Sequence, residues 1–318
     1  MIVAVASGKG GTGKTTVAVS LALSLAAGTT SDEPAAPPLP YSEGSSPLFL
    51  DCDVEEPNAA LFLRPVIEEQ REVGLLVPEI DLGLCTYCGR CAEVCEYHAI
   101  AVLEKQVLVF SEMCHGCGSC ALNCPETAIR EVLHPMGTIE RGRPGEIAFA
   151  QGTMNVGQAM ATPIIRQLKH WAISPRAAAA QSRAPAERPI ILDAPPGAAC
   201  PVVETMRGAN VVLMVTEPTP FGLHDLRVAV KVARDELGLP VSVVVNRDGV
   251  GDQGVDEYCA SEGIPVLMRI PLDRRIAEAY SEGIPLVDAL PACRERFAHL
   301  WEQLVALGSS SVHVGVDR

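Results

Sequence analysis

Eight cysteines lie within residues 85–124 and form two runs of identical spacing. The runs are Cys85-x2-Cys88-x2-Cys91-x3-Cys95 and, 29 positions later, Cys114-x2-Cys117-x2-Cys120-x3-Cys124. Such short spacings bring several thiolates to one metal centre and are typical of metal clusters in a reducing compartment. Paired Cys-x2-Cys units also bind Zn²⁺, so a zinc ribbon is the alternative, which two identical four-cysteine runs disfavour.

The two runs resemble those of bacterial two-cluster ferredoxins, in which the fourth cysteine of each run ligates the cluster of the other run. The resemblance implies two [4Fe-4S] clusters, the first held by Cys85, Cys88, Cys91 and Cys124 and the second by Cys114, Cys117, Cys120 and Cys95. Glu96 stands where Pro125 follows the second run, a departure that removes no ligand. Alternating apolar residues between 101 and 109 predict a hairpin that joins the two halves.

A glycine loop near the start of the chain also carries chemistry. Residues 7–16 read Ser-Gly-Lys-Gly-Gly-Thr-Gly-Lys-Thr-Thr between the apolar runs 2–6 and 17–27. This order matches the phosphate-loop pattern, in which backbone N–H groups and a helix N-terminus bind phosphate oxygens. The pattern predicts that Lys14 contacts the β and γ phosphates and that Thr15 supplies a hydroxyl to Mg²⁺. The predicted nucleotide-binding residues of the loop are Gly8, Gly10, Gly11, Thr12, Gly13, Lys14, Thr15 and Thr16.

A second lysine, Lys9, lies inside this loop. With it, residues 9–16 resemble the deviant Walker A motif of the superfamily of MinD, ParA and the nitrogenase iron protein. In that superfamily the extra lysine reaches the nucleotide bound to the other subunit, much as an arginine finger acts in trans. The resemblance therefore implies an ATP-bound homodimer in which Lys9 is catalytic. The alternative is a lysine that is only solvated.

Acidic residues follow two further apolar runs, and such positions lie at the ligand-binding edge of an open α/β sheet. By the same resemblance, Asp53 belongs to switch I, where it orients the attacking water and contacts Mg²⁺. Asp193 resembles the Walker B aspartate, which binds Mg²⁺ through water. Asp51 is expected to be structural, and for Asp53 alone a polar loop is the alternative. The Pro-Pro-Gly after Asp193 resembles switch II, which implies that the N–H of Gly197 meets the γ-phosphate.

Two strand ends near the C-terminus correspond to the loops that hold adenine in the superfamily. The resemblance implies that Asn246 hydrogen-bonds the base and that Pro271 packs on it. Gly249 stands where the Asn-Lys-x-Asp signature of guanine binders has its aspartate. ATP is therefore expected in preference to GTP.

These residues require strands that all present their carboxyl ends at one edge. Apolar strands are expected at 2–6, 48–50, 189–192, 211–216, 241–245 and 266–270, with helices at 17–27, 157–171, 222–237 and 291–307. This alternation predicts an α/β fold, a doubly wound and mostly parallel P-loop sheet.

The cysteine runs interrupt this sheet. They predict an inserted α+β ferredoxin domain at 64–135, with the MinD-like ATPase domain formed by 1–63 and 136–318. A hairpin at 130–152 is expected to lead back from the insert. Residues 28–47 and 174–188, rich in Pro, Ala and small polar residues, are expected to be a surface insertion and a connector.

Composition excludes some partners. The chain has 318 residues and a formal net charge of −14, which disfavours a nucleic-acid partner. No apolar stretch reaches the ~20 residues of a membrane helix, and no stable membrane anchor is expected. We therefore expect a cytoplasmic protein. Cys200 follows Asp193 at a spacing that resembles a cluster ligand of the nitrogenase iron protein, but one cysteine defines no site, and we expect a free thiol.

Together the motifs predict a slow Mg²⁺-dependent ATPase with ATP, Mg²⁺ and two [4Fe-4S] clusters as cofactors. In one interpretation, ATP-driven dimerisation is coupled to electron transfer to a partner protein, as in the nitrogenase iron protein. In another, the protein carries or assembles a metal cluster for a partner, as Mrp-type relatives do. Spatial positioning, as by MinD, is a third interpretation and lacks a supporting membrane helix. Four cysteines per cluster favour electron transfer.

Overall fold

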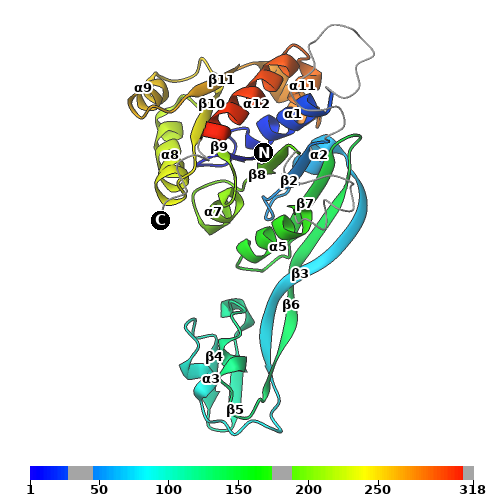
Figure 1. The fold of residues 1–318 in the computed structure, drawn as a ribbon, viewed down its shortest axis with the longest axis vertical. Coiled ribbons are helices and arrows are strands. Elements are labelled where there is room, and N and C mark those ends of the chain that lie inside the picture. Colours follow the sequence, from blue (N-terminus) through cyan, green and yellow to red (C-terminus); the bar gives the residue numbers. More distant parts are fainter. Residues whose placement is uncertain (28–45, 174–187, 311–318) are drawn as a thin grey trace.

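A nine-stranded sheet forms the centre of the protein, whose computed structural model describes residues 1–27, 46–173 and 188–310 (Figure 1). Its parallel strands are β1 (Ile2–Ala6), β2 (Leu48–Asp51), β7 (Ala148–Met154), β8 (Ile190–Asp193), β9 (Val211–Thr216), β10 (Val241–Asp248) and β11 (Val266–Pro271). Two longer strands, β3 (Val66–Ile80) and β6 (Ile129–Arg143), are antiparallel. The strand order is β11-β10-β9-β1-β8-β2-β7-β6-β3.

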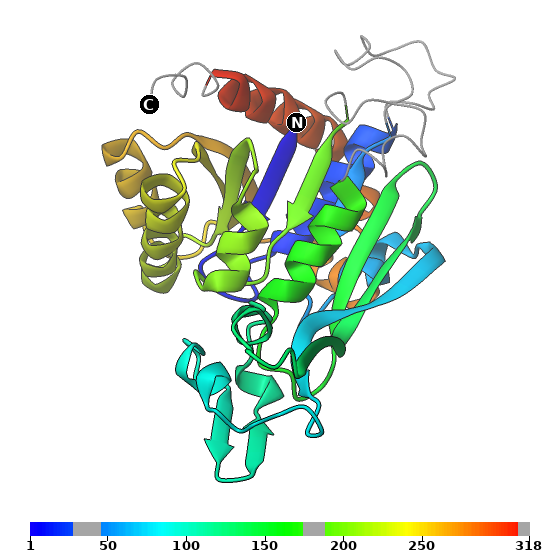
Figure 2. The same ribbon diagram turned by 60° about the horizontal axis from the view of Figure 1, so that its bottom comes forward.

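Helices cover both faces of this sheet, as Figures 1 and 2 show. One face carries α1 (Lys14–Ala27), α2 (Ala59–Leu63), α10 (Arg274–Ser281), α11 (Leu286–Ala289) and α12 (Cys293–Ser310), and the other α5 (Thr162–Ile173), α7 (Cys200–Met206), α8 (Pro220–Val230) and α9 (Gly254–Ser261). Val3 and Val5 of β1 belong to the first core, and Ala4 and Ala6 to the second, as the two-residue period of a strand requires. The predicted doubly wound α/β fold is therefore confirmed.

All four predicted helices are present with shifted ends, and the helix expected at 17–27 begins at Lys14. The helix expected at 157–171 begins at Thr162, and the C-terminal helix continues to Ser310. The helix expected at 222–237 begins at Pro220, where the Thr219 hydroxyl caps it by accepting the Gly222 N–H (3.0 Å). It continues as a π-helical segment, Lys231–Glu236.

Strands β3 and β6 leave the sheet together as a long ribbon (Figure 1). Strand β6 pairs with β7 from Gly137 to Gly142, whereas residues 129–135 pair with β3 alone. We call the paired segments 74–80 and 129–135 the arm. Where the arm begins, Val73 pairs with Gly137 and Gly74 with Pro135, so Met136 between them is bulged. The predicted insert boundary at 63/64 does not mark a structural division, because residues 66–73 are part of the main sheet.

The arm carries a small module, residues 81–128, built from two similar halves. It contains the predicted hairpin, β4 (Ile100–Leu103) and β5 (Gln106–Val109), and the short helices α3 (Arg90–Glu93), η1 (Ser111–Met113) and α4 (Ser119–Leu122). Positive φ angles recur 29 positions apart, at Tyr87 and Gly116, at Gly89 and Gly118, and at His98 and Thr127. The sequence repeat is therefore a repeat of backbone conformation.

Two expectations remain, one for the surface insertion and the connector and one for a membrane anchor. The surface insertion at 28–47 and the connector at 174–188 lie almost wholly outside the described residues. Across 1–27, 46–173 and 188–310, no helix is both long and apolar enough to cross a membrane.

The arm begins at a close backbone approach that yields a stability prediction. A Cβ on Gly74 would lie 1.9 Å from the carbonyl oxygen of His134. Because that oxygen is backbone, Gly74→Ala should lower the free energy of unfolding by about 1–3 kcal/mol, measured by chemical denaturation. Gly83→Ala is the matched control, since its Cβ would meet only the mobile end of Asp81 at 3.2 Å. Equal unfolding midpoints for the two variants would contradict the close approach.

Candidate functional site

The glycine loop joins β1 to α1 and presents unpaired donors. Lys14 and Thr15 are buried at the start of the helix. The first helical backbone bond runs from the Val17 N–H to the Gly13 carbonyl (3.0 Å), so the N–H groups of the preceding turn have no acceptor within the helix. Such N–H groups at a helix N-terminus attract anions. The loop therefore has the donors that a phosphate group requires.

The glycines of the loop are open on one side and packed on the other. A Cβ on Gly10 or Gly11 would meet no atom within 4 Å. On Gly8 it would lie 2.1 Å from the Asp225 carbonyl oxygen of α8, and on Gly13, which has φ +92°, it would lie 2.4 Å from the side-chain nitrogen of Asn246. Neighbouring elements thus clamp the loop, while its open side is free to receive a ligand.

Two buried carboxylates lie side by side beneath the loop. Asp51 of β2 and Asp193 of β8 are register partners on neighbouring parallel strands, and both are fully buried. Asp51 accepts backbone N–H groups from Asp53 (3.1 Å), Asn58 (3.0 Å) and Ala59 (3.0 Å). It thereby holds the loop that contains Asp53.

Asp193 has no comparable set of donors. Neither of its buried carboxylate oxygens has a hydrogen-bond partner of acceptable geometry within the described chain. Burial raises the pKa of Asp193, and the Lys14 ammonium and Thr15 hydroxyl nearby oppose that rise. Burial also raises the pKa of Asp53 to about 6, against the opposing effect of Lys14. Lys14 therefore lies within electrostatic reach of both carboxylates.

This donor set fits Mg²⁺ bound to a nucleotide. Oxygen ligands are those that Mg²⁺ prefers, and the bare oxygens of Asp193 lie close to the Thr15 hydroxyl. Lys14 supplies positive charge for phosphate oxygens at the same place. The structure thus brings together Lys14, Thr15, Asp53 and Asp193 as the sequence predicts, while their roles remain predictions.

Glu217, just after β9, is a buried carboxylate that the sequence analysis missed. It accepts a hydrogen bond from Lys9 Nζ (3.2 Å) and one from the Arg247 guanidinium (2.5 Å). Arg247 also donates to the Gly11 carbonyl (3.3 Å). Lys9 is therefore held within its own chain. The signal that pointed to Asp193, an acidic residue after an apolar strand, applies equally to Glu217.

The N–H of Gly197, which was expected to meet the γ-phosphate, is bonded within the chain in this conformation. Its N–H donates to the Ser7 carbonyl (2.9 Å) and is therefore not free to meet a γ-phosphate. The φ of +99° at Gly197 allows the turn after Asp193 to fold back onto the glycine loop. Binding of a phosphate by this N–H would first require the bond to Ser7 to break.

Asn246 contacts the glycine loop through its side-chain amide. Its side-chain nitrogen donates to the Thr12 carbonyl (2.7 Å), and its oxygen accepts the Arg247 N–H (2.9 Å). One N–H of its amide thus supports the glycine loop, while the second N–H is left for a ligand, and its hydrogen bond to adenine stays a prediction. Pro271 is exposed at the end of β11, paired with Asp248 of β10, and its packing on a base remains a prediction.

The eight cysteines of the module line two cavities in the predicted sets. The first is lined by Cys85, Cys88, Cys91 and Cys124, together with Ile80, Val102, Val107 and Ile129. The second is lined by Cys95, Cys114, Cys117 and Cys120, together with Leu76, Pro78 and Ile100. The fourth cysteine of each run thus lies with the first three of the other run, in apolar surroundings.

Backbone donors to sulfur repeat in both halves. They run from Tyr87 to Cys85 (3.4 Å), Gly116 to Cys114 (3.4 Å), Ala99 to Cys95 (3.3 Å) and Ala128 to Cys124 (3.3 Å). Such donors favour thiolate ligands and tune the potential of iron–sulfur clusters. Within the described residues, no group of three or more His, Cys, Asp or Glu side chains could hold a single metal ion. The four cysteines that line each cavity match the four thiolate ligands of a [4Fe-4S] cluster.

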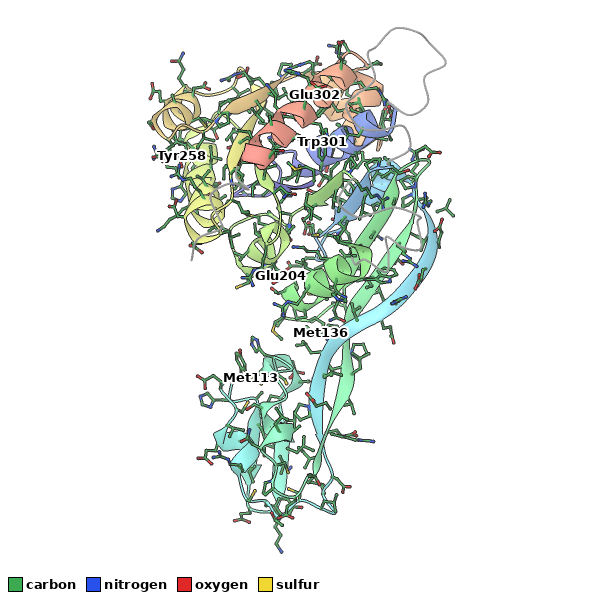
Figure 3. The ribbon with its side chains drawn as sticks, viewed as in Figure 1. Met113, Met136, Glu204, Tyr258, Trp301 and Glu302 are labelled. Atoms are coloured by element: carbon green, nitrogen blue, oxygen red, sulfur yellow. The ribbon has the colours of Figure 1, made fainter. Side chains whose placement is uncertain are left out.

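The two cavities follow one another along the arm. Leu76 and Pro78 of β3 line the second cavity, whereas Ile80, farther from the main sheet, lines the first. At the rise of a strand, this offset is roughly 10 Å. Figure 3 shows Met113, the neighbour of Cys114, on the side of the module that faces the body. The second cavity is therefore nearer the body. Cys200 is exposed and lines neither cavity.

Comparison with known proteins finds relatives of the cysteine module and of the chain as a whole. Residues 77–125 match the family model described as a 4Fe-4S dicluster domain. The chain is 30% identical over 290 residues to the uncharacterized protein MJ0579 of Methanocaldococcus jannaschii, covering 89% of this chain and 90% of that protein. The chain belongs to the MJ0579 family. A second protein of that organism, MJ0578, is 26% identical over 306 residues, covering 96% of each chain.

Solved structures of MinD share the fold of this MJ0579-family protein. MinD from Pyrococcus horikoshii, solved with Mg-ADP, matches with a TM-score of 0.52 at 18% identity and 98% coverage of both chains. The MinC–MinD complex of Aquifex aeolicus gives 0.53 at 14% identity and 96% coverage of both chains. The predicted recognition, a MinD-like P-loop fold with an inserted 4Fe-4S ferredoxin domain, is confirmed.

The crossed cysteine sets yield a second prediction. Cys95→Ser should disturb the same cluster as Cys114→Ser, although Cys95 belongs to the other run, because both line one cavity. After anaerobic reconstitution, each variant should retain about four of about eight irons and lose the same electron paramagnetic resonance signal. Cys85→Ser, the control from the other cavity, should lose the other signal. A Cys95→Ser spectrum that matches Cys85→Ser would show that the sets are wrong.

Proposed function

We propose that this protein binds and slowly hydrolyses ATP, and that ATP-driven dimerisation is coupled to electron transfer through two [4Fe-4S] clusters to a partner protein. The observation that carries the proposal is that both cysteine cavities lie on an arm that leaves the same sheet whose edge forms the phosphate loop. Nucleotide site and redox centres are thus built on one continuous scaffold.

The ATPase part rests on the polar groups at the sheet edge. Lys14 is placed to bind phosphate oxygens, and Thr15 and Asp193 to hold Mg²⁺, Asp193 through water. With a pKa of about 6, Asp53 is mostly charged at neutral pH, the form that accepts a hydrogen bond from an attacking water. When bound, Mg-ATP supplies the phosphoryl group that is transferred to this water.

The dimer part rests on Lys9. Its side chain is 32% exposed and held by Glu217 of its own chain. We propose that Lys9 exchanges this partner for the γ-phosphate bound to a second copy, as the deviant Walker A resemblance implies. Arg247 stays bound to Glu217 after the exchange, so the buried carboxylate keeps a cationic partner.

The electron-transfer part rests on the cysteine cavities. Each would hold a cluster by four thiolates, a complete ligand set for a [4Fe-4S] cube. When bound, the clusters supply one-electron redox chemistry. Their offset along the arm gives a path between the body and the outer end of the module, where a redox partner would dock.

One observation favours a second candidate, a carrier that assembles or delivers clusters. Cys88 of the first cavity and Cys117 of the second are exposed, so an acceptor could reach a thiolate of each site. A carrier would lose iron to an apo-acceptor during ATP turnover, whereas an electron-transfer protein would keep it.

Two substitutions separate nucleotide binding from hydrolysis. Lys14→Ala should abolish tight binding of Mg-ATP, because it removes the cation at the phosphates. Asp53→Ala should keep that affinity within a few-fold and lower the turnover roughly 10²-fold or more. Phosphate release and equilibrium binding measure the two effects, with Lys231→Met, a change at an exposed residue where the π-helical segment after α8 begins, as the control. Normal hydrolysis by Asp53→Ala would refute its role in switch I.

A further inference from the structure

Helix α5 lies between the helix that follows Asp193 and the start of the arm. Figure 1 shows α5 against β6 and β3, beside α7. Figure 3 labels Glu204 of α7 and Met136 of β6, both of which lie close to α5. The helix was expected from its apolar face alone, and its polar residues were given no role.

Polar contacts bind α5 to the C-terminal end of α7. Lys169 Nζ donates to three backbone carbonyls there, those of Glu204 (2.6 Å), Thr205 (2.9 Å) and Arg207 (2.7 Å). A cation at the last carbonyls of a helix compensates both their unpaired oxygens and the helix dipole. Arg166 adds two hydrogen bonds to the Glu204 carboxylate (3.3 and 3.1 Å). The two helices are therefore linked as one unit.

A separate set of contacts binds α5 to the start of the arm. Gln167 donates to the carbonyl of Gly74 (2.8 Å), the residue at which the arm begins. One turn on, Trp171 packs against the guanidinium groups of Arg71 of β3 (4.9 Å) and Arg141 of β6 (4.8 Å). The apolar face of α5 shares a core with Met136, the bulged residue of β6.

The loop after β2 reaches the same place by another contact. The Val54 carbonyl, one residue past Asp53, accepts the N–H of Met154 (2.7 Å), and the next N–H, that of Asn155, donates to the Met136 carbonyl (2.8 Å). The start of the arm is thus linked to the loop after Asp53 through the end of β7, and to α7, which follows Asp193, through α5.

A bulge and a proline interrupt the regular ladder at the start of the arm. Met136 is an extra residue opposite the Val73–Gly74 bond, and bulges of this kind bend a strand. Pro135, beside it, has no N–H to donate to the ladder. We call residues 73–74 and 135–137 the hinge.

From these contacts we infer that α5 transmits the nucleotide state of the Asp193–Gly197 loop to the cluster-bearing arm, with Lys169 and Gln167 as the positioning residues that link α7 to the hinge. The inference rests on the proposed function, since it supplies the route by which ATP would act on the clusters. If a γ-phosphate takes the Gly197 N–H from the Ser7 carbonyl, the start of α7 moves. Lys169 and Arg166 then carry α5 along, and Gln167 shifts the hinge.

Hydrogen exchange of the cluster-loaded full chain tests this route. With Mg²⁺ and a non-hydrolysable ATP analogue, amides of the hinge should change their exchange rate at least fivefold in the wild type. Gln167→Ala should reduce that change below twofold while leaving nucleotide affinity and dimerisation within twofold of wild type. Lys169→Met should do the same, and Lys231→Met, the matched lysine control, should behave as wild type.

Two results would overturn the inference. One is a full nucleotide response of the hinge in Gln167→Ala, which keeps the test decisive even if Lys169→Met fails to fold. The other is a wild-type hinge that does not respond although the protein binds the analogue and dimerises. Reduction potentials measured on the same samples keep the proposed function separate: potentials that shift with nucleotide in all variants would refute the α5 route and leave the coupling itself intact.

Discussion

The burial of Asp51 and Asp193 on adjacent strands is the constraint on which the nucleotide site depends. Two carboxylates removed from water disfavour each other's charge, and both pKa values are raised. Asp51 is compensated by three backbone N–H groups, which fix the loop after β2. Asp193 is left with Lys14 and Thr15 nearby and bare oxygens. A cation bound at these oxygens would compensate the buried charge of Asp193 further.

That constraint makes the surrounding loops responsive. Asp51 organises the loop of Asp53, and the turn after Asp193 is held by one bond from Gly197 to Ser7. Glu217 binds Lys9 at the same edge of the sheet. The Gly197–Ser7 and Lys9–Glu217 contacts are single hydrogen bonds, so each can be exchanged for a ligand contact, which is the property that a two-state switch requires.

The cysteine module lies on the arm, outside the body, so coupling of nucleotide to clusters within one chain would have to pass along the arm. A coupling of this kind is a free-energy difference between two arrangements, and spatial continuity alone does not demonstrate it. The contacts of α5 and of the loop after β2 meet at the hinge, where a bulge and a proline weaken the ladder. The ribbon beyond it is paired without interruption from Gly74 to Ile80, so a small rotation at the hinge would displace both cluster sites together.

Much of the fold could be predicted from the sequence because its strands are buried on both faces. Such strands read as continuous apolar runs, and the runs at β1, β8, β9 and β10 stand out for that reason. The cysteine runs also predicted the ferredoxin module, because thiolates that bind one cluster must lie at short, regular spacings, which the sequence shows directly. Strand β3 gave no such signal: residues 68–72 are Glu-Glu-Gln-Arg-Glu, mostly exposed, without the alternation that one buried face would impose.

The sequence could not predict which groups form hydrogen bonds with each other. Asn246 and Gly197 were placed at the correct edge, but their hydrogen bonds go to Thr12 and Ser7, contacts that only the packed structure defines. Lys169 was given no role, because nothing in the local sequence reveals that three carbonyls at the end of α7 lie within its reach.

The reduction potential of the clusters with and without a nucleotide tests the central claim most directly. We expect a non-hydrolysable ATP analogue with Mg²⁺ to shift at least one cluster potential, and reduction to change the affinity for that analogue by the same free energy, because linkage is reciprocal. Iron should be retained through many ATP turnovers in the presence of an apo-acceptor. Unchanged potentials together with rapid transfer of iron to the acceptor would contradict coupled electron transfer.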